Sequence, residues 1–221
     1  MKALKISKIS IGILMVFSLL TSGCFFGTFQ TAQTLEPGGV DAGWYVNYPF
    51  YFDKVSREEA KDRGNAYTLP NIGGYIGYGT NGSFDVGLRG SLGEGIGPYG
   101  KLRLLNEAPF SLGTLFGFGY HPVAQGISLH LDLLVSKRLS RFSSIYTGLE
   151  ILRMPDYRRG ADAPAIQDVD DFKQFEAIFF GIKASRKGGG KYRGLPFGIT
   201  LEFAFPLTEN PALIFGVQFE R

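Results

Sequence analysis

The sequence has little of the chemistry that disulfide-bonded, thiol-dependent or helical membrane proteins need. Its 221 residues include one cysteine, one tryptophan and two histidines. A lone cysteine excludes an internal disulfide. Beyond residue 23 no apolar run approaches the roughly 20 residues of a transmembrane helix. If the rest of the chain crosses a membrane, it must therefore do so with β-strands.

The beginning of the chain has the order of an export signal. Three lysines lie among the first eight residues, Ile9–Leu20 is apolar, and the small residues Thr21–Gly23 lead into Cys24. This order resembles the lipobox of bacterial lipoproteins, with Thr21 where leucine is commoner. The resemblance implies a signal peptide over residues 1–23 and an acylated Cys24 that anchors the protein in membrane lipid. The alternative is an ordinary export signal with an incidental cysteine.

The net charge does not point to a nucleic-acid partner. The chain has 23 basic and 20 acidic residues, and the signal accounts for the excess because it holds three lysines and no acid. The charges are balanced from Cys24 onward, so we expect no nucleic-acid binding. Phe25, rather than aspartate, follows the cysteine, which resembles lipoproteins sorted to the outer membrane.

Composition and spacing predict an all-β domain after a short tether. The chain contains 31 glycines, 20 phenylalanines and 11 tyrosines, which favours many short strands joined by turns. Residues 24–39 are predicted as the tether, because they are small and polar and end in Pro37-Gly38-Gly39. Residues 40–221 are predicted as one β-barrel domain.

Alternation with a period of two defines the predicted strands. Phe84, Val86 and Leu88, for example, alternate with Asp85, Gly87 and Arg89. Similar segments lie near residues 40–53, 69–79, 84–92, 98–105, 110–120, 127–136, 144–151, 174–185, 195–205 and 213–220; residues 93–97 are predicted as a glycine-rich turn. The segment 174–185 is nearly continuously apolar, so its two faces are not assigned. We predict an antiparallel up-and-down barrel of about ten strands, with 8–12 as the range.

The two faces of the strands differ in a way that favours a membrane barrel. One face is almost unbroken Leu, Ile, Val and Phe, and the other is mostly Gly, Ser and Tyr with scattered charges. The first face suits lipid and the second suits a narrow interior. The charged residues predicted to line that interior are Asp85, Arg89, Lys101, Arg103, Asp132, Glu150 and Glu202. We expect a plugged interior rather than a wide channel. A soluble, lipocalin-like barrel is the alternative.

The connections indicate an orientation. Long, charged connections follow the first and seventh predicted strands, and mostly tight turns follow the even-numbered strands. The chain resembles outer-membrane barrels in this respect and in Phe219 near its end, although Glu220 and Arg221 follow that aromatic residue. We therefore expect the long loops outside the cell and both termini in the periplasm.

One set of polar residues has catalytic chemistry. Ser128, His130 and Asp132 share a face of one predicted strand, and together they supply a hydroxyl, an imidazole and a carboxylate. The resemblance to outer-membrane lipid A deacylases and omptin proteases extends only to a histidine-containing dyad or triad on a barrel strand. Same-face neighbours are about 7 Å apart along a strand, so we expect no direct hydrogen bonds among these side chains. Ordinary interior polarity is the favoured interpretation.

The loops suggest partners but no cofactor. Tyr157, Arg158 and Arg159 are placed to contact lipopolysaccharide phosphates or an envelope protein. The acidic residues near Asp168 lack the spacing of a calcium loop, so we predict no metal site and no cofactor. We expect a lipid-anchored outer-membrane barrel with a structural, binding or minor-pore role. The alternatives are a hydrolase acting on lipid or peptide through His130, and a periplasmic lipocalin-like barrel that binds a hydrophobic ligand.

Overall fold

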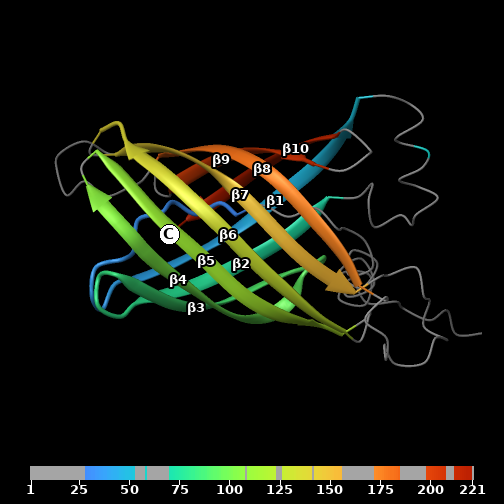
Figure 1. Cartoon of the computed structure of the whole chain (residues 1–221), viewed down its shortest axis with the longest axis horizontal. Helices are drawn as coiled ribbons and strands as arrows, with labels where there is room; N and C mark the ends of the chain where they lie inside the picture. Colours follow the sequence, from blue (N-terminus) through green and yellow to red (C-terminus); the bar gives the residue numbers. More distant parts are fainter. Residues whose placement is uncertain are drawn as a thin grey trace, which may run out of the picture.

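The computed structural model is a closed barrel of antiparallel strands (Figure 1). It describes residues 28–52, 58, 70–107, 109–122, 126–140, 142–155, 172–184, 198–207 and 212–220. The predicted signal peptide, Cys24 and the loop residues Tyr157–Arg159 and Asp168 lie outside these ranges. The described residues form ten strands: β1 (Val40–Tyr51), β2 (Asn71–Gly79), β3 (Phe84–Ser91), β4 (Gly95–Glu107), β5 (Phe110–His121), β6 (Gly126–Arg138), β7 (Ser143–Pro155), β8 (Phe172–Ala184), β9 (Gly198–Pro206) and β10 (Ala212–Glu220). None of the described residues forms a helix of the length and apolarity that a bilayer crossing needs.

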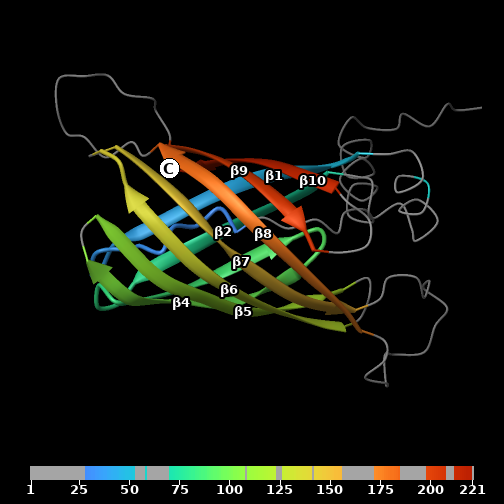
Figure 2. The ribbon, with the colours of Figure 1, turned by 45° about the horizontal axis from the view of Figure 1, so that its top comes forward.

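Each strand pairs with its neighbours in sequence, and β1 pairs with β10 to close the sheet. At this closure Trp44 lies opposite Phe219, and their rings stack with centroids 4.6 Å apart. Closure gives each described strand a neighbour on both sides, so the sheet has no edge strand among the described residues. The prediction of an antiparallel up-and-down barrel of about ten strands is confirmed (Figure 2).

The structure assigns the faces that the sequence left open on β8. Phe175, Ala177 and Phe179 are buried, whereas Ile178, Phe180 and Ile182 are exposed. Pairing on both sides sets this parity, because β8 is in register with β7 and with β9. A nearly continuous apolar run does not show which of its residues face inward, so the pairing with neighbouring strands determines the two faces.

The prediction was wrong at the start of β4. Residues 93–97 were expected as a glycine-rich turn, but the strand begins at Gly95, which has a φ of 79°. The register with β5 shifts between Arg103 and Leu105, as in a β-bulge. Leu104 and Leu105 consequently both face outward, and Arg103 is only partly buried.

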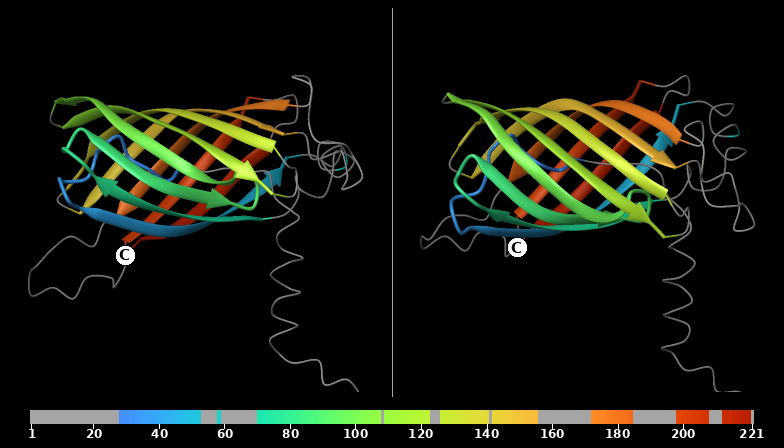
Figure 3. Two further views of the ribbon diagram at one scale, coloured as in Figure 1. Left: turned by 90° about the horizontal axis from the view of Figure 1, so that it is seen from below. Right: turned by 60° about the horizontal axis from the view of Figure 1, so that its bottom comes forward.

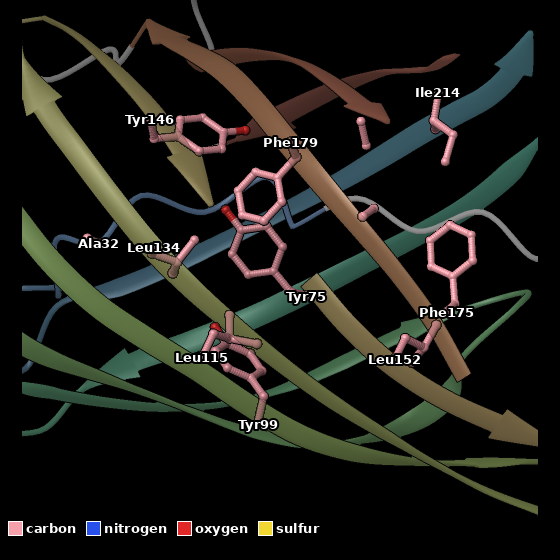
Figure 4. Packing of buried hydrophobic residues seen from close by; sticks show 12 residues of the cluster. Ala32, Tyr75, Tyr99, Leu115, Leu134, Tyr146, Leu152, Phe175, Phe179 and Ile214 are labelled. Carbon is pink, nitrogen blue, oxygen red and sulfur yellow. The ribbon is translucent and has the colours of Figure 1, made fainter. Parts of the chain in front are cut away.

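Aromatic rings opposite glycines fill much of the interior. Tyr75, Tyr99, Tyr146 and Phe179 belong to one buried cluster, in which the close-up view shows them projecting from different strands (Figure 4). A Cβ added at Gly181 would overlap the ring of Tyr146. The many glycines of the inward faces therefore make room for large rings in a narrow barrel.

We expect Gly181→Val to destabilise the barrel by about 1–3 kcal/mol, because the new side chain must displace a packed ring. Tyr146 cannot move freely, since its hydroxyl donates a 2.6 Å hydrogen bond to Glu202. Urea unfolding of the protein in lipid vesicles measures the effect. Ile182→Val, at the exposed neighbouring position, is the matched control and should change little. Equal losses from both variants would contradict the proposed tight fit.

Most of the described part of the predicted tether, residues 28–35, lies inside the barrel, whereas residues 36–38 are exposed at its end. Residues 28–32 are buried, and Figure 3 shows the blue N-terminal segment within the ring of strands. Gly38 donates a hydrogen bond to the carbonyl of Gly79, at the end of the barrel where β1 begins. We call residues 28–35 the internal segment. It brings backbone donors into contact with the charged interior.

Candidate functional site in the barrel interior

Glu202 on β9 holds the internal segment. Its Oε1 accepts a hydrogen bond of 2.9 Å from the backbone N–H of Thr28, and its Oε2 accepts one of 2.7 Å from that of Phe29. The Tyr146 hydroxyl on β7 also donates to Oε2. A fully buried carboxylate needs such donors, because water no longer solvates it. Glu202 therefore ties the segment to two strands of the wall.

The ring of Phe29 packs against β10 and β1, the two strands that follow β9 around the barrel. It stacks on Tyr45 of β1 with centroids 4.9 Å apart, and a Cβ added at Gly216 of β10 would overlap it. Phe29 is the only described residue other than glycine with a positive φ, 49°. This unusual conformation is accompanied by both the Glu202 bond and the ring contact, which hold the backbone in place.

Asp132 joins the segment to a second polar group. One carboxylate oxygen accepts a 2.9 Å hydrogen bond from the Thr28 hydroxyl, and the other lies 2.7 Å from His130 Nε2. The same histidine nitrogen lies 3.3 Å from a carboxylate oxygen of Glu150 on β7. A protonated His130 would offset part of the negative charge of this buried group.

Two further ion pairs complete the interior. Arg89 on β3 donates to Glu94, in the β3–β4 turn, over 2.7 Å, and its guanidinium lies 5.7 Å from the centre of the Tyr45 ring. Lys101 on β4 lies 3.1 Å from Asp85 on β3 and donates to the Gln30 side chain over the same distance. Asp85 also accepts from the backbone N–H of Leu35. The segment thus meets charged side chains along its length.

The structure brings together only two of the three catalytic candidates. His130 and Asp132 form the direct hydrogen bond that strand spacing appeared to forbid, so that expectation was wrong: a long imidazole spans the gap. Ser128 is directed elsewhere, with its hydroxyl donating to the carbonyl of Glu94 over 2.6 Å. Ser128 and Asp132 are buried, and His130 is 8% exposed. The Ser128 hydroxyl is therefore bonded to a backbone carbonyl and not to His130, the base that its activation would require.

The residues predicted to line the interior are placed as follows. Six of them, Asp85, Arg89, Lys101, Asp132, Glu150 and Glu202, are buried among inward-facing side chains. Arg103 is the exception, since it is only partly buried next to the β-bulge. Their partners include residues that sequence reasoning missed, namely Glu94 and the internal segment. Glu94 had been included in a glycine-rich turn, and the polar residues of the segment were attributed to a tether.

One group among the described residues has the composition of a metal site. Ligand-type atoms of Glu94, His130 and Glu150 lie within 4.8 Å of one another. Arg89 already binds Glu94, and Asp132 already binds His130, so a cation would have to replace these contacts. The group is therefore described as an internal ion-pair network.

Comparison with known proteins gives little beyond these observations. No protein-family model matches the chain, and a search of curated proteins finds no similar sequence. Two matched crystal structures are of Ail, the attachment invasion locus protein of Yersinia pestis, one of them in complex with the heparin analogue sucrose octasulfate. Both are 11% identical to this chain and cover 85% of it and all of Ail, with TM-scores of 0.30 and 0.29. At this level of similarity we transfer no property of Ail to this chain.

Proposed function

We propose that this chain is a lipid-anchored β-barrel of the bacterial outer membrane whose interior is closed by its own N-terminal segment. Its role is structural or binding, exercised at the membrane surface, rather than transport through a wide pore. The outward face of the barrel carries this proposal. The alternatives require a different distribution of polar and apolar groups.

The outward face is apolar on strand after strand. On β6 the buried Ser128, His130 and Asp132 alternate with exposed apolar side chains, which are Ile127, Leu129, Leu131, Leu133 and Val135. The same alternation continues on β1, β5, β8 and β9. A surface of this extent is far larger than the apolar patches that soluble monomers expose, and lipid is the solvent that suits it.

A groove on the outer surface belongs to the same apolar face. It has a volume of about 600 Å³ and crosses β2, β3 and the start of β4. Ile72, Ile76, Leu88 and Ile96 contribute its apolar walls, and glycines form much of the rest of its lining. A recess of this kind fits hydrocarbon chains, which supports contact with lipid on this side of the barrel.

The two alternative functions fit the interior poorly. A lipocalin-like barrel needs an apolar cavity for its ligand, whereas this interior holds ion pairs and the internal segment. A hydrolase acting through His130 needs an activated nucleophile and access for substrate, whereas the Ser128 hydroxyl is bonded to a backbone carbonyl and His130 is buried. The filled interior also supports a closed rather than a porous barrel.

The experiment that tests the proposal removes the lipid and asks whether the strands hold the protein in the membrane. Residues 1–23 are replaced by an ordinary cleavable export signal together with Cys24→Ser, and the membranes are washed with carbonate. We expect the protein to remain in the outer-membrane fraction and to change gel mobility on heating, while the native chain incorporates labelled palmitate and the variant does not. A folded protein released by the wash would overturn the membrane barrel, and a native chain without palmitate would overturn the lipid anchor.

A further inference from the structure

The internal segment has a direction relative to the two mouths of the barrel. We call the end where β1 begins and β10 ends the proximal mouth; the β2–β3, β4–β5 and β6–β7 turns lie there too. The opposite end is the distal mouth, where the β3–β4 turn lies and where the long connections after β1 and β7 leave the wall. Each contact of the segment can therefore be assigned a depth.

Read backwards from β1, the segment leads away from the proximal mouth. Leu35 bonds Asp85, near the proximal end of β3, and the Thr34 hydroxyl bonds the carbonyl of Gly82 in the β2–β3 turn. Gln30 meets Lys101, which is the register partner of Asp85 on β4. Thr28 meets Asp132, midway along β6. Residues 35 to 28 therefore ascend from the proximal mouth to the middle of the barrel.

The distance from Asp132 to the distal mouth is close to the length that the residues between Cys24 and Thr28 can span. Asp132 is midway along a 13-residue strand, which places it about 15 Å from the distal mouth at the usual rise and tilt. Cys24 is four residues before Thr28, and four residues span at most about 14 Å. An extended chain would therefore bring Cys24, which bears the acyl chains, close to the distal mouth.

A return to the proximal mouth would compete with the side chains that pack inside the barrel. The chain would have to run back beside residues 28–35, and a second extended strand needs about 4.8 Å of width. That space is occupied by Tyr45, Tyr146 and Phe179, all at most 3% exposed, and by the Lys101–Asp85 pair. These buried side chains count against a return and favour the distal direction.

We infer that the lipid-bearing N-terminus of this protein is threaded through its own barrel, so that Cys24 and the C-terminus lie at opposite mouths. The inference rests on the proposed lipid-anchored outer-membrane barrel. With the long connections outside the cell, as in outer-membrane barrels generally, the acyl chains are held at the cell surface. This differs from the periplasmic N-terminus expected from the sequence, because the sequence does not show the tether entering the interior.

An epitope tag inserted between Gly27 and Thr28, and joined to Thr28 by a flexible linker of about ten residues that is long enough to reach past the distal mouth, tests the side of the membrane. Two reference chains carry the same tag after Ala161, in the long β7–β8 connection, or after Arg221. We expect antibody to bind intact cells carrying the Gly27 or Ala161 tag to a similar extent, and to bind the Arg221 tag only after the outer membrane is permeabilised. Binding of the Gly27 tag only after permeabilisation would overturn the threaded path.

A cysteine cross-linking trap in the full-length acylated chain provides the second measurement. The Cα of Ala32 lies 3.3 Å from the position of a Cβ at Gly113, which is too close for ordinary disulfide geometry, so a short bis-thiol reagent is used to bridge Ala32→Cys and Gly113→Cys if the segment is inside. We expect bridging in palmitate-labelled protein. Labelled protein that stays unbridged would refute threading while leaving the lipid anchor intact, and absence of palmitate would instead refute the anchor on which the inference rests.

Discussion

Leu131→Arg is expected to destabilise the membrane-embedded barrel by about 2–4 kcal/mol, the cost of placing an arginine at the lipid-facing midplane of such a barrel. Leu131 lies midway along β6, faces outward and is 42% exposed. Urea unfolding in lipid vesicles measures the loss. In cells, we expect less of the folded, heat-modifiable form. The effect is large because lipid cannot solvate the guanidinium.

The control for this variant uses the same residue at the membrane boundary. Val40→Arg changes an outward-facing residue at the proximal mouth, where water reaches the side chain, and should cost at most about 1 kcal/mol. In a soluble barrel both positions would be solvated, and an exposed arginine would be neutral at either. Equal and small effects at the two positions would therefore contradict the membrane barrel.

Glu202→Ala is expected to release the internal segment and to lower the free energy of unfolding by about 2–4 kcal/mol. The change removes the acceptor for the N–H groups of Thr28 and Phe29 and for the Tyr146 hydroxyl, and each buried donor left without a partner costs about 1–3 kcal/mol. Hydrogen exchange followed by mass spectrometry reads out the segment directly. The amides of residues 28–35 should exchange faster in the variant, whereas those of β6 should remain protected.

Two further substitutions distinguish this effect from a general loss of charge. Glu176→Ala, on the neighbouring strand β8, changes a half-buried carboxylate that bonds Gln174 and should leave exchange in the segment unchanged. Glu202→Gln retains one carbonyl oxygen as an acceptor and should fall between the native chain and Glu202→Ala. Unchanged protection of residues 28–35 in Glu202→Ala would show that other contacts hold the segment.

The strands of this barrel were predictable from the sequence because their periodicity is local. Outward Phe84, Val86 and Leu88 alternate with inward Asp85 and Arg89, and pairing of neighbouring strands preserves that parity around the barrel. Where the local signal was weak, prediction failed or stopped. The apolar β8 took its faces from β7 and β9, and β4 began earlier than its glycines suggested.

The candidate site was less predictable because its contacts join distant residues. His130 and Asp132 share a strand face by sequence, but their direct bond depends on side-chain conformation, and Glu150 reaches them from β7. The internal segment has no periodicity that distinguishes it from a linker. Its partners Asp85, Asp132 and Glu202 come from three different strands.

The sequence alone therefore determined the strand number, the antiparallel order and the charged character of the inward face, since each follows from alternation and turn spacing along a single stretch of chain. Only the tertiary structure decided what fills the barrel. Closure of β1 on β10 forms an interior whose buried carboxylates require donors, and the backbone of Thr28 and Phe29 supplies them. That requirement arises only when the strands have closed around the segment. It therefore cannot be predicted from the local alternation of apolar and polar residues.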